Sequence, residues 1–154
     1  MTTIAYRDGI LAVDSRSTRG NTIVPGACAK LVRMKDGSVA TGCGTKGNIA
    51  AFIRWLDDGK EGKPPKLDKS TIVHLQADGR VFEYWDENPV ETTGPFEAWG
   101  SGADFALGCL WAGLSAEEAV RAACKCDSGS GEPVFTMRVE VPSPAPCKPK
   151  KKRK

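Results

Sequence analysis

The sequence lacks the features of membrane-inserted and exported proteins. No apolar run approaches the ~18 residues that a membrane-spanning helix needs. The opening stretch MTTIAYRDG has no basic start followed by a long apolar segment, so we expect no signal peptide. Six cysteines without an export signal indicate a reducing compartment. We therefore expect a cytoplasmic protein that does not associate with membranes.

The sequence also has few of the residues and motifs that form metal and nucleotide sites. The chain has one histidine, His74, and its only closely spaced cysteines are Cys124 and Cys126. A Cys-x-Cys pair without a second cluster is a poor zinc site, so we expect no metal and no other cofactor. The phosphate-binding pattern Gly-x-x-x-x-Gly-Lys is absent, so any ATPase that serves this protein is expected to be a separate chain.

The composition is that of an ordinary globular domain, with 40% hydrophobic and 27% charged residues among 154. Its charge is unevenly distributed, because the last thirteen residues (142–154) hold six basic and no acidic residues. We therefore divide the chain into a mildly acidic domain, 1–141, and a basic tail, 142–154, that we expect to be disordered. We interpret this tail as a solvated segment rather than a nucleic-acid-binding one, since the four tryptophans are scattered.

Turn and periodicity signals predict the elements of the domain. Asp-Gly pairs at 8–9, 36–37 and 78–79 stand between short apolar or β-branched runs, which predicts three antiparallel hairpins. Apolar residues at helical spacing predict helices over 48–58 and 103–113. Ser115 with Glu118 forms a capping box that opens a third helix, to about residue 125. Alternation over 134–141 predicts a final strand, and the polar segment 57–70 is expected to be a loop.

The first Asp-Gly turn bears on the position of the threonines near the start of the chain. We expect a three-residue loop, Arg7-Asp8-Gly9, because a three-residue hairpin loop ending in Gly is common. Thr2 then falls directly opposite Asp14 on the same face, with the two Cβ atoms ~5 Å apart. A two-residue Asp8-Gly9 loop would instead shift the register by one residue and move Thr2 to the other face.

The second Asp-Gly turn is interpreted in the same way, with residues 35–37 as its loop. Its register places Lys30 opposite Gly42 and diagonal to Gly44. If the two hairpins are neighbours, a Thr, an Asp and a Lys side chain meet beside a Gly-rich strand end.

Several motifs occur in a particular order along the chain. They are Thr2-Thr3-Ile4 followed by Asp14-Ser15-Arg16, Thr18 and Lys30, then the segment 44–56, then Gly100-Ser101-Gly102, and then Asp127-Ser128-Gly129-Ser130-Gly131. Together they resemble the proteasome β subunits and the bacterial HslV peptidase, which are N-terminal-nucleophile hydrolases. The stretch Gly20-Asn21-Thr22 resembles HslV in particular. The resemblance covers most of residues 2–141 and implies an α+β fold, a four-layer αββα sandwich of two mostly antiparallel sheets flanked by helices.

The resemblance implies that Thr2 is the nucleophile of a threonine-type endopeptidase. A Thr hydroxyl needs a base, and an N-terminal Thr carries its own in the α-amino group, whose pKa is ordinarily ~7.7–8.0. A nearby Lys30 ammonium disfavours a second positive charge on that amine. Asp14 would hold Lys30 in place. This chemistry requires the removal of Met1, for which the small residue at position 2 is suited.

Further residues take their expected roles from the same resemblance. Ser101, Asp127 and Ser130 would orient the terminal amine and relay protons. The Gly44 N–H would stabilise the tetrahedral oxyanion, with Gly42 as the alternative. The residues expected to contact the substrate are Arg16, Thr18 and Lys46, and Lys46 is expected to favour acidic residues before the scissile bond.

The resemblance also implies polypeptide substrates, a homo-oligomeric ring with the sites inside and a separate ATPase unfoldase. The chain departs from these families in two places. The first hairpin is four residues shorter than is usual in these families, and the segment 57–70 takes the place of their long second helix, which leaves the ring size open. Two alternatives to a peptidase remain: a noncatalytic scaffold subunit with the same fold, and a small-molecule amidase that uses the same N-terminal Thr.

Overall fold

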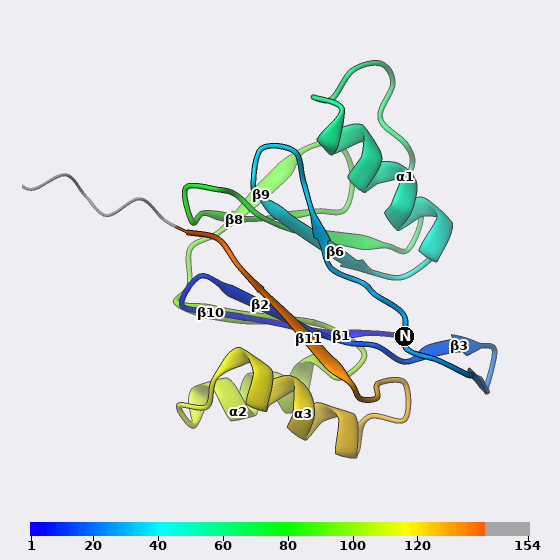
Figure 1. Cartoon of the computed structure of the whole chain (residues 1–154), viewed down its shortest axis with the longest axis vertical. Coiled ribbons are helices and arrows are strands. Elements are labelled where there is room, and N and C mark those ends of the chain that lie inside the picture. Colours follow the sequence, from blue (N-terminus) through cyan, green and yellow to red (C-terminus); the bar gives the residue numbers. More distant parts are fainter. Residues whose placement is uncertain (141–154) are drawn as a thin grey trace, which may run out of the picture.

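The structure of the protein is a computed structural model that describes residues 1–140 (Figure 1). Within these residues the chain forms an α+β fold of antiparallel strands and three helices. The elements are β1 (Thr3–Arg7), β2 (Ile10–Asp14), β3 (Ser17–Arg19), β4 (Thr22–Val24), β5 (Val32–Arg33), β6 (Val39–Cys43), α1 (Lys46–Asp57), β7 (Thr71–Leu75), β8 (Val81–Tyr84), β9 (Pro89–Thr92), β10 (Phe96–Gly100), α2 (Ala103–Trp111), α3 (Ala116–Cys126) and β11 (Val134–Arg138). The basic tail expected over 142–154 lies outside the described residues.

The strands form two larger sheets and one small hairpin. The four-stranded sheet has the order β10-β1-β2-β11, and the five-stranded sheet has the order β5-β6-β7-β8-β9. All strand pairs in both are antiparallel. β3 and β4 pair only with each other, and this hairpin projects from the rest of the molecule in Figure 1.

The two larger sheets lie between helices. Alternate residues of a strand point to opposite faces, so in β1 Ile4 packs between the sheets while Ala5 packs under α2 and α3. α1 packs against β6 and β7 on the far side of the five-stranded sheet, through Phe52 among others. Figure 1 shows the same succession, with α1 at the top and α2 and α3 at the bottom. Three apolar clusters therefore hold the sheets and helices together.

Most of the predicted elements are confirmed. The three hairpins are present, the second with the predicted register, in which Val32 pairs with Ala40. The three helices are present, and the third begins with the predicted capping box at Ser115 and Glu118. The last strand ends at Arg138, earlier than predicted. The short strands β3, β4, β9 and β10 were not predicted.

The predicted register of the first hairpin is wrong. Arg7 pairs with Ile10, so the loop has two residues, Asp8 and Gly9. Both have positive φ, 51° and 74°, which is the twist that a two-residue hairpin needs. The register is therefore shifted by one residue, and it is Thr3 rather than Thr2 whose backbone lies against Asp14.

No helix within residues 1–140 is long and apolar enough to span a bilayer.

Candidate active site

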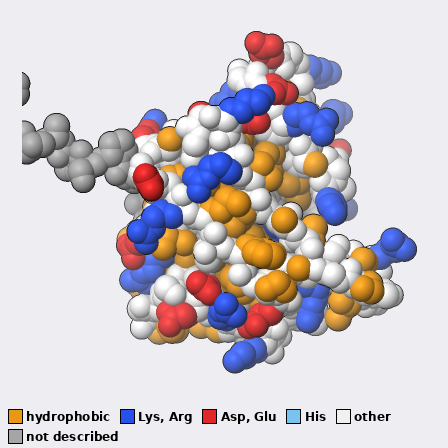
Figure 2. Space-filling model, viewed as in Figure 1, with side chains coloured by type: hydrophobic (Ala, Val, Ile, Leu, Met, Phe, Trp, Pro, Cys, Tyr) orange, Lys and Arg blue, Asp and Glu red, His pale blue; other side chains and the backbone are white. Residues whose placement is uncertain are grey.

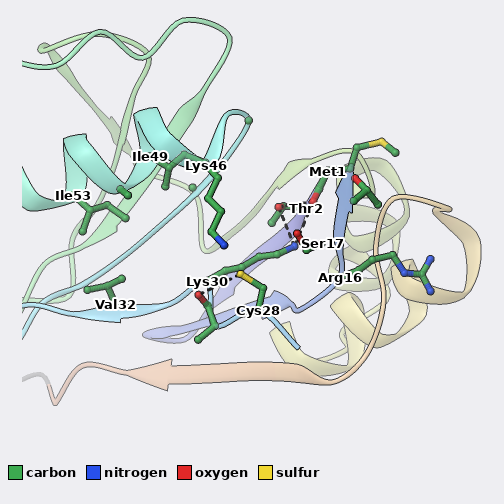
Figure 3. A pocket seen from close by; sticks show the side chains of 15 residues that line it. Met1, Thr2, Arg16, Ser17, Cys28, Lys30, Val32, Lys46, Ile49 and Ile53 are labelled. Carbon is green, nitrogen blue, oxygen red and sulfur yellow. Dashed lines mark hydrogen bonds between the residues drawn. The ribbon is translucent and has the colours of Figure 1, made fainter. Parts of the chain in front are cut away.

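A pocket of about 300 Å³ opens where the ends of β1 and β2 approach the five-stranded sheet (Figure 3). Its lining includes the apolar side chains of Val32, Ile49 and Ile53 and the amines of Lys30 and Lys46. The full lining is Met1, Thr2, Arg16, Ser17, Thr18, Cys28, Ala29, Lys30, Val32, Gly42, Gly44, Lys46, Ile49, Ala50 and Ile53. An apolar cavity with a few convergent polar groups is the usual form of a ligand site.

Thr2, Lys30 and Asp14 meet at one side of this pocket. The Lys30 Nζ donates a hydrogen bond to the Asp14 Oδ1 at 2.8 Å and another to the Thr2 Oγ1 at 3.1 Å. Figure 3 shows the Lys30 amine turned toward Thr2. The Asp14 side chain is fully buried and that of Lys30 is 12% exposed, so water screens this ion pair weakly. An ammonium group at this distance can stabilise negative charge that develops on the Thr2 oxygen.

Backbone N–H groups complete the surroundings of the Asp14 carboxylate. Its Oδ1 also accepts from the Thr3 N–H, and its Oδ2 accepts from the Arg16 and Gly131 N–H groups, each at 3.0 Å. Asp14 is the last residue of β2. The chain turns toward β3 directly after it, and the segment that leads into β11 lies beside it, so these two segments supply the Arg16 and Gly131 N–H donors. The carboxylate is thus held rigidly, and it fixes the position of Lys30.

A second network joins the remaining polar residues predicted for the site. The Asp127 Oδ2 accepts from the Ser101 Oγ at 2.7 Å and from the Ser130 Oγ at 2.6 Å. Burial opposes ionisation of Asp127, but hydrogen bonds from Ser130, Ser101 and the Gly129 N–H outweigh it and hold the pKa of this carboxyl below its ordinary value. The Ser130 Oγ lies 2.6 Å from the Thr3 Oγ1. This network therefore adjoins residue 3, and none of its hydroxyls bonds directly to the Thr2 side chain.

The Gly-Ser-Gly sequence explains how this network reaches the start of the chain. A Cβ on Gly100 would overlap the Thr2 carbonyl oxygen, and a Cβ on Gly102 would overlap the Thr3 Oγ1. Between them, the Ser101 N–H donates to the Thr2 carbonyl at 2.9 Å. Only glycines allow the turn from β10 into α2 to pack this closely on residues 2 and 3.

The other predicted site residues fall into two groups. Gly44, Gly42, Thr18 and Lys46 all line the pocket, and Figure 3 shows the Lys46 side chain directed toward Lys30. Arg16 also lines the pocket, but its guanidinium points away from Thr2 and donates to the Ser128 carbonyl at 2.9 Å. This hydrogen bond ties Arg16 to the loop before β11.

Met1 occupies the space next to Thr2. Its carbonyl oxygen accepts from the Thr2 Oγ1 at 2.7 Å and from the Lys30 Nζ at 3.3 Å. Its side chain rests against Gly129. While Met1 is attached, the nitrogen of Thr2 is an amide and cannot serve as a base.

Two cysteines near the site, Cys43 and Cys124, are poorly suited to be nucleophiles. Burial raises the pKa of the Cys43 thiol, and burial together with the Asp14 charge raises the pKa of Cys124 to about 11. Since the thiolate is the reactive form, both thiols stay protonated near neutral pH. Within residues 1–140 no group of three His, Cys, Asp or Glu side chains is gathered closely enough to hold a metal ion.

Comparisons with known proteins bear on the fold. No protein-family model matches the sequence, and no curated protein sequence matches it. The structure is similar to that of Thiobacillus denitrificans BPH, with a TM-score of 0.63 and 20% identity over 90% of this chain and 98% of that one. It matches BPH in complex with Epoxomicin over the same shares of both chains, with the same TM-score and 19% identity. This is a proteasome-like fold.

Within the proteasome-like fold, sequence reasoning missed the part played by Thr3. Its N–H binds Asp14 and its hydroxyl meets Ser130, so it links the two networks of the site. A signal was present, because a two-residue Asp8-Gly9 loop places Thr3 opposite Asp14. The apolar part of the pocket lining, which includes Ile49 and Ile53 of α1, was also missed, since the α1 periodicity alone does not say which apolar residues line a cavity.

Proposed function

We propose that this protein is a threonine-type endopeptidase that uses Thr2, freed by removal of Met1, as its nucleophile. One observation carries the proposal: the Lys30 amine bridges the Thr2 hydroxyl and the buried Asp14 carboxylate at the edge of a pocket. The fold adds support, since a protein with a similar structure was solved with Epoxomicin, a threonine protease inhibitor.

The proposed reaction begins with attack of the Thr2 Oγ on the carbonyl carbon of the scissile peptide bond. The hydroxyl proton passes to the Thr2 α-amino group, and the Lys30 ammonium stabilises the charge on Oγ. The carbonyl oxygen becomes an oxyanion that the Gly44 N–H stabilises, in a role for which Gly42 is the alternative. When the C–N bond breaks, the leaving amine takes a proton from the α-ammonium. An ester between the substrate acyl group and Thr2 remains.

Hydrolysis of this ester completes the cycle. The α-amino group takes a proton from a water molecule, whose oxygen attacks the ester carbonyl, and the Thr2 oxygen leaves with a proton. Ser101, Asp127 and Ser130 are proposed to orient the α-amino group through the network around residue 3. Thr18 and Lys46 are proposed to contact the substrate, and Arg16 to support them through the loop at Ser128.

We propose the wider setting of this activity as well. The fold is proposed to be the αββα sandwich of N-terminal-nucleophile hydrolases, HslV-like in its maturation, acting on polypeptides within a homo-oligomeric ring served by a separate ATPase. Five cysteines are free thiols in the described part of the chain, which supports a reducing, cytoplasmic location.

The intact mass of the purified protein tests the proposal, measured before and after treatment with a peptide epoxyketone. This reagent needs both the hydroxyl and the free amine of an N-terminal Thr. We expect loss of Met1 and one adduct, absent from the Thr2→Ala variant. Thr22→Ala, at an exposed position of β4 outside the pocket lining, is the matched control in which the nucleophile and its networks are kept.

Retention of Met1 with no adduct, in cells with active methionine aminopeptidase, would overturn the proposal in favour of a scaffold subunit. An adduct on Thr2 accompanied by hydrolysis of simple amides in preference to peptides would instead identify an amidase. A fluorogenic peptide panel tests the role of Lys46, and equal cleavage of acidic and apolar peptides would exclude the acidic preference proposed for it.

A further inference from the structure

Charge is segregated along the sequence in a way that the proposed chemistry does not explain. Residues 15–35 contain five Lys and Arg and no Asp or Glu, whereas residues 81–120 contain eight Asp and Glu and no Lys or Arg. The first segment includes β3, β4 and β5, and the second includes β8, β9 and β10. Two surfaces of opposite sign therefore follow from two stretches of sequence.

The fold places these two segments on opposite edges of the molecule. β9 and β10 are edge strands of the two larger sheets and are joined by a short connection, and the Trp99 Nε1 of β10 donates to the Glu83 carboxylate of β8 at 2.9 Å. At the other edge are β5 and β11, which the Arg33 guanidinium joins by donating to the Arg138 carbonyl at 2.7 Å. The width of both sheets separates the two edges.

We call the first of these the acidic edge. Its exposed carboxylates are Asp86, Glu87 and Glu91, and none of the three is in an ion pair with any residue of the described chain. Two large apolar side chains are exposed among them, Trp85 at 56% and Val90 at 44%. Apolar groups ringed by charge of one sign are typical of a surface that meets a partner.

We call the second the basic edge. Arg33 of β5 and Arg138 of β11 are exposed, as is Arg19 on the hairpin that leads toward β5, and none has a carboxylate partner within residues 1–140. Val32 and Ile23 are exposed apolar side chains of the same segment. Figure 2 looks onto the side where β11 is in front, and there Lys and Arg side chains, together with some Asp and Glu, lie around a central apolar area.

We propose that the acidic edge of one molecule binds the basic edge of a second copy of the same chain. The sign of charge on the two edges is complementary, and each carries exposed apolar side chains and an edge strand with unpaired backbone groups. The contact joins two different surfaces, so it is head-to-tail, and repetition of it produces a ring if the rotation closes. The ring of the proposed function would then have this interface between neighbours.

The charges also argue against a contact between two like edges. Two acidic edges face each other with unpaired carboxylates, and two basic edges with unpaired arginines, and like charges juxtaposed at an interface cost several kcal/mol. A symmetric dimer through either edge is therefore disfavoured relative to the head-to-tail contact.

Sedimentation velocity of the Thr2→Ala protein tests this interface. This variant lacks the proposed nucleophile, so the result does not depend on whether the protein is a peptidase. We expect assemblies larger than a monomer in 0.1 M salt and monomers in 1 M salt, where the Debye length falls from about 10 Å to about 3 Å. A protein that stays monomeric in 0.1 M salt would overturn the proposal.

Charge reversal makes the test specific to the two edges. Arg33→Glu with Arg138→Glu reverses the basic edge, and Glu87→Arg with Glu91→Arg reverses the acidic edge. Each double variant alone is expected to weaken self-association about tenfold or more per reversed pair. An equal mixture of the two is expected to assemble again with alternating subunits, because every contact in it is complementary.

Matched controls separate the edges from a general effect of charge. Arg54→Glu with Lys63→Glu makes the same change in net charge as the basic-edge variant, at exposed positions of α1 and the following loop, and should leave assembly unchanged. Circular dichroism checks that each variant is folded. The proposal is wrong if folded edge variants assemble as the parent does, or if their mixture stays monomeric. Neither result bears on epoxyketone labelling of Thr2, so the interface and the peptidase activity can fail separately.

Discussion

At the scale of single residues, burial of the Asp14–Lys30 ion pair opposes folding. Removing two charges from water costs several kcal/mol per ion unless good geometry and further hydrogen bonds compensate. Asp14 meets this condition, since three backbone N–H groups and the Lys30 amine surround its oxygens. A pair of apolar residues would serve stability as well, so we infer that the pair is there to place an ammonium group beside the Thr2 hydroxyl.

Replacing Lys30 tests that interpretation. Lys30→Met keeps the length of the side chain but removes the charge next to the Thr2 Oγ1, and loss of one group that stabilises developing negative charge costs about 10²–10³-fold in rate. We expect peptide hydrolysis to fall within that range, measured as kcat/KM on a fluorogenic peptide. Lys46→Met is the matched control, since it also removes a lysine from the pocket lining but leaves the contact with Thr2 intact. Equal losses in the two variants would mean that Lys30 acts only through the charge of the pocket.

His74 has a different role, in the pH dependence of stability. It is buried in β7, its Nε2 lies 2.9 Å from the Ser38 Oγ, and burial lowers its pKa below the usual ~6.5. Between these two values the unfolded chain binds a proton that the folded chain does not, so the free energy of unfolding falls as the pH falls. One proton limits the slope to about 1.4 kcal/mol per pH unit.

Urea unfolding between pH 7 and pH 5 measures this slope. The wild-type protein should lose stability as the pH falls below about 6.5, and His74→Gln should remove the pH dependence from that window. Carboxylates with lowered pKa, such as Asp36 and Asp127, affect stability only at lower pH, so they do not confuse the result. A slope that persists in His74→Gln would assign the proton to another group.

At the scale of elements, short-range signals predicted the hairpins and helices because local chemistry determines them. The Asp-Gly turns and the Ser115 capping box act within four residues, so the sequence alone is sufficient to find them. The loop length at Asp8-Gly9 was mistaken because two- and three-residue loops both accept Asp-Gly. The difference is one residue in register, and it decides whether Thr2 or Thr3 lies against Asp14.

Strands β9 and β10 were missed for a physical reason. Pro89, Gly94 and Pro95 interrupt this stretch, and such residues weaken a strand prediction. In the structure β9 and β10 are edge strands, where proline is tolerated because a backbone N–H on the outer side has no partner. These residues therefore occur at sheet edges, whereas periodicity alone predicts that this stretch contains no strand.

Two glycines of one segment provide a test of how the β10–α2 turn supports the site. Gly102 precedes α2 and a Cβ there would overlap the Thr3 Oγ1, whereas Gly108 lies in α2 with open space around its Cβ position. We expect Gly108→Ala to raise the free energy of unfolding by about 0.5–1 kcal/mol, because Ala is the better helix former. Gly102→Ala should lower it by about 1–3 kcal/mol, as overpacking does.

Denaturant unfolding measures the stability of these two glycine variants, and epoxyketone labelling measures the reactivity of Thr2 in each. Labelling of Thr2 should slow in Gly102→Ala, because the Thr3–Ser130–Asp127 network must shift, and should be unchanged in Gly108→Ala. If Gly102→Ala labels at the normal rate despite its lower stability, the network does not orient the α-amino group.

At the scale of the whole molecule, the site exists only because distant parts of the chain meet. Thr2 and Asp14 come from one sheet, Lys30 from the approach to the other, and Ser101 and Asp127 from the two ends of the helix pair. Periodicity and spacing give no distances between such segments. From the sequence, only the resemblance to known hydrolases assigns these residues to one site. That the polar network adjoins Thr3 rather than the Thr2 hydroxyl could come only from the packed structure.

The same packing has a consequence for the removal of Met1. Thr2 is 6% exposed, its carbonyl accepts from the Ser101 N–H, and the Thr3 N–H donates to Asp14. An aminopeptidase must draw Met1, Thr2 and Thr3 into its own site in extended form, which breaks both hydrogen bonds. Together these bonds are worth about 3 kcal/mol, so the open state should be populated about 100-fold less than in a free chain.

We therefore predict that Met1 is removed before the chain folds, and that a folded molecule which retains it stays inactive. Folded protein produced with the aminopeptidase inhibited should lose Met1 about 100-fold more slowly than the peptide MTTIAYRDGI when both are treated with methionine aminopeptidase. Intact mass measured over time gives both rates. Asp14→Asn, which weakens the bond to the Thr3 N–H, should speed removal from the folded protein. Equal rates for protein and peptide would show that the start of β1 opens freely, and Thr2 would then lack the fixed position beside Lys30 that the proposed chemistry requires.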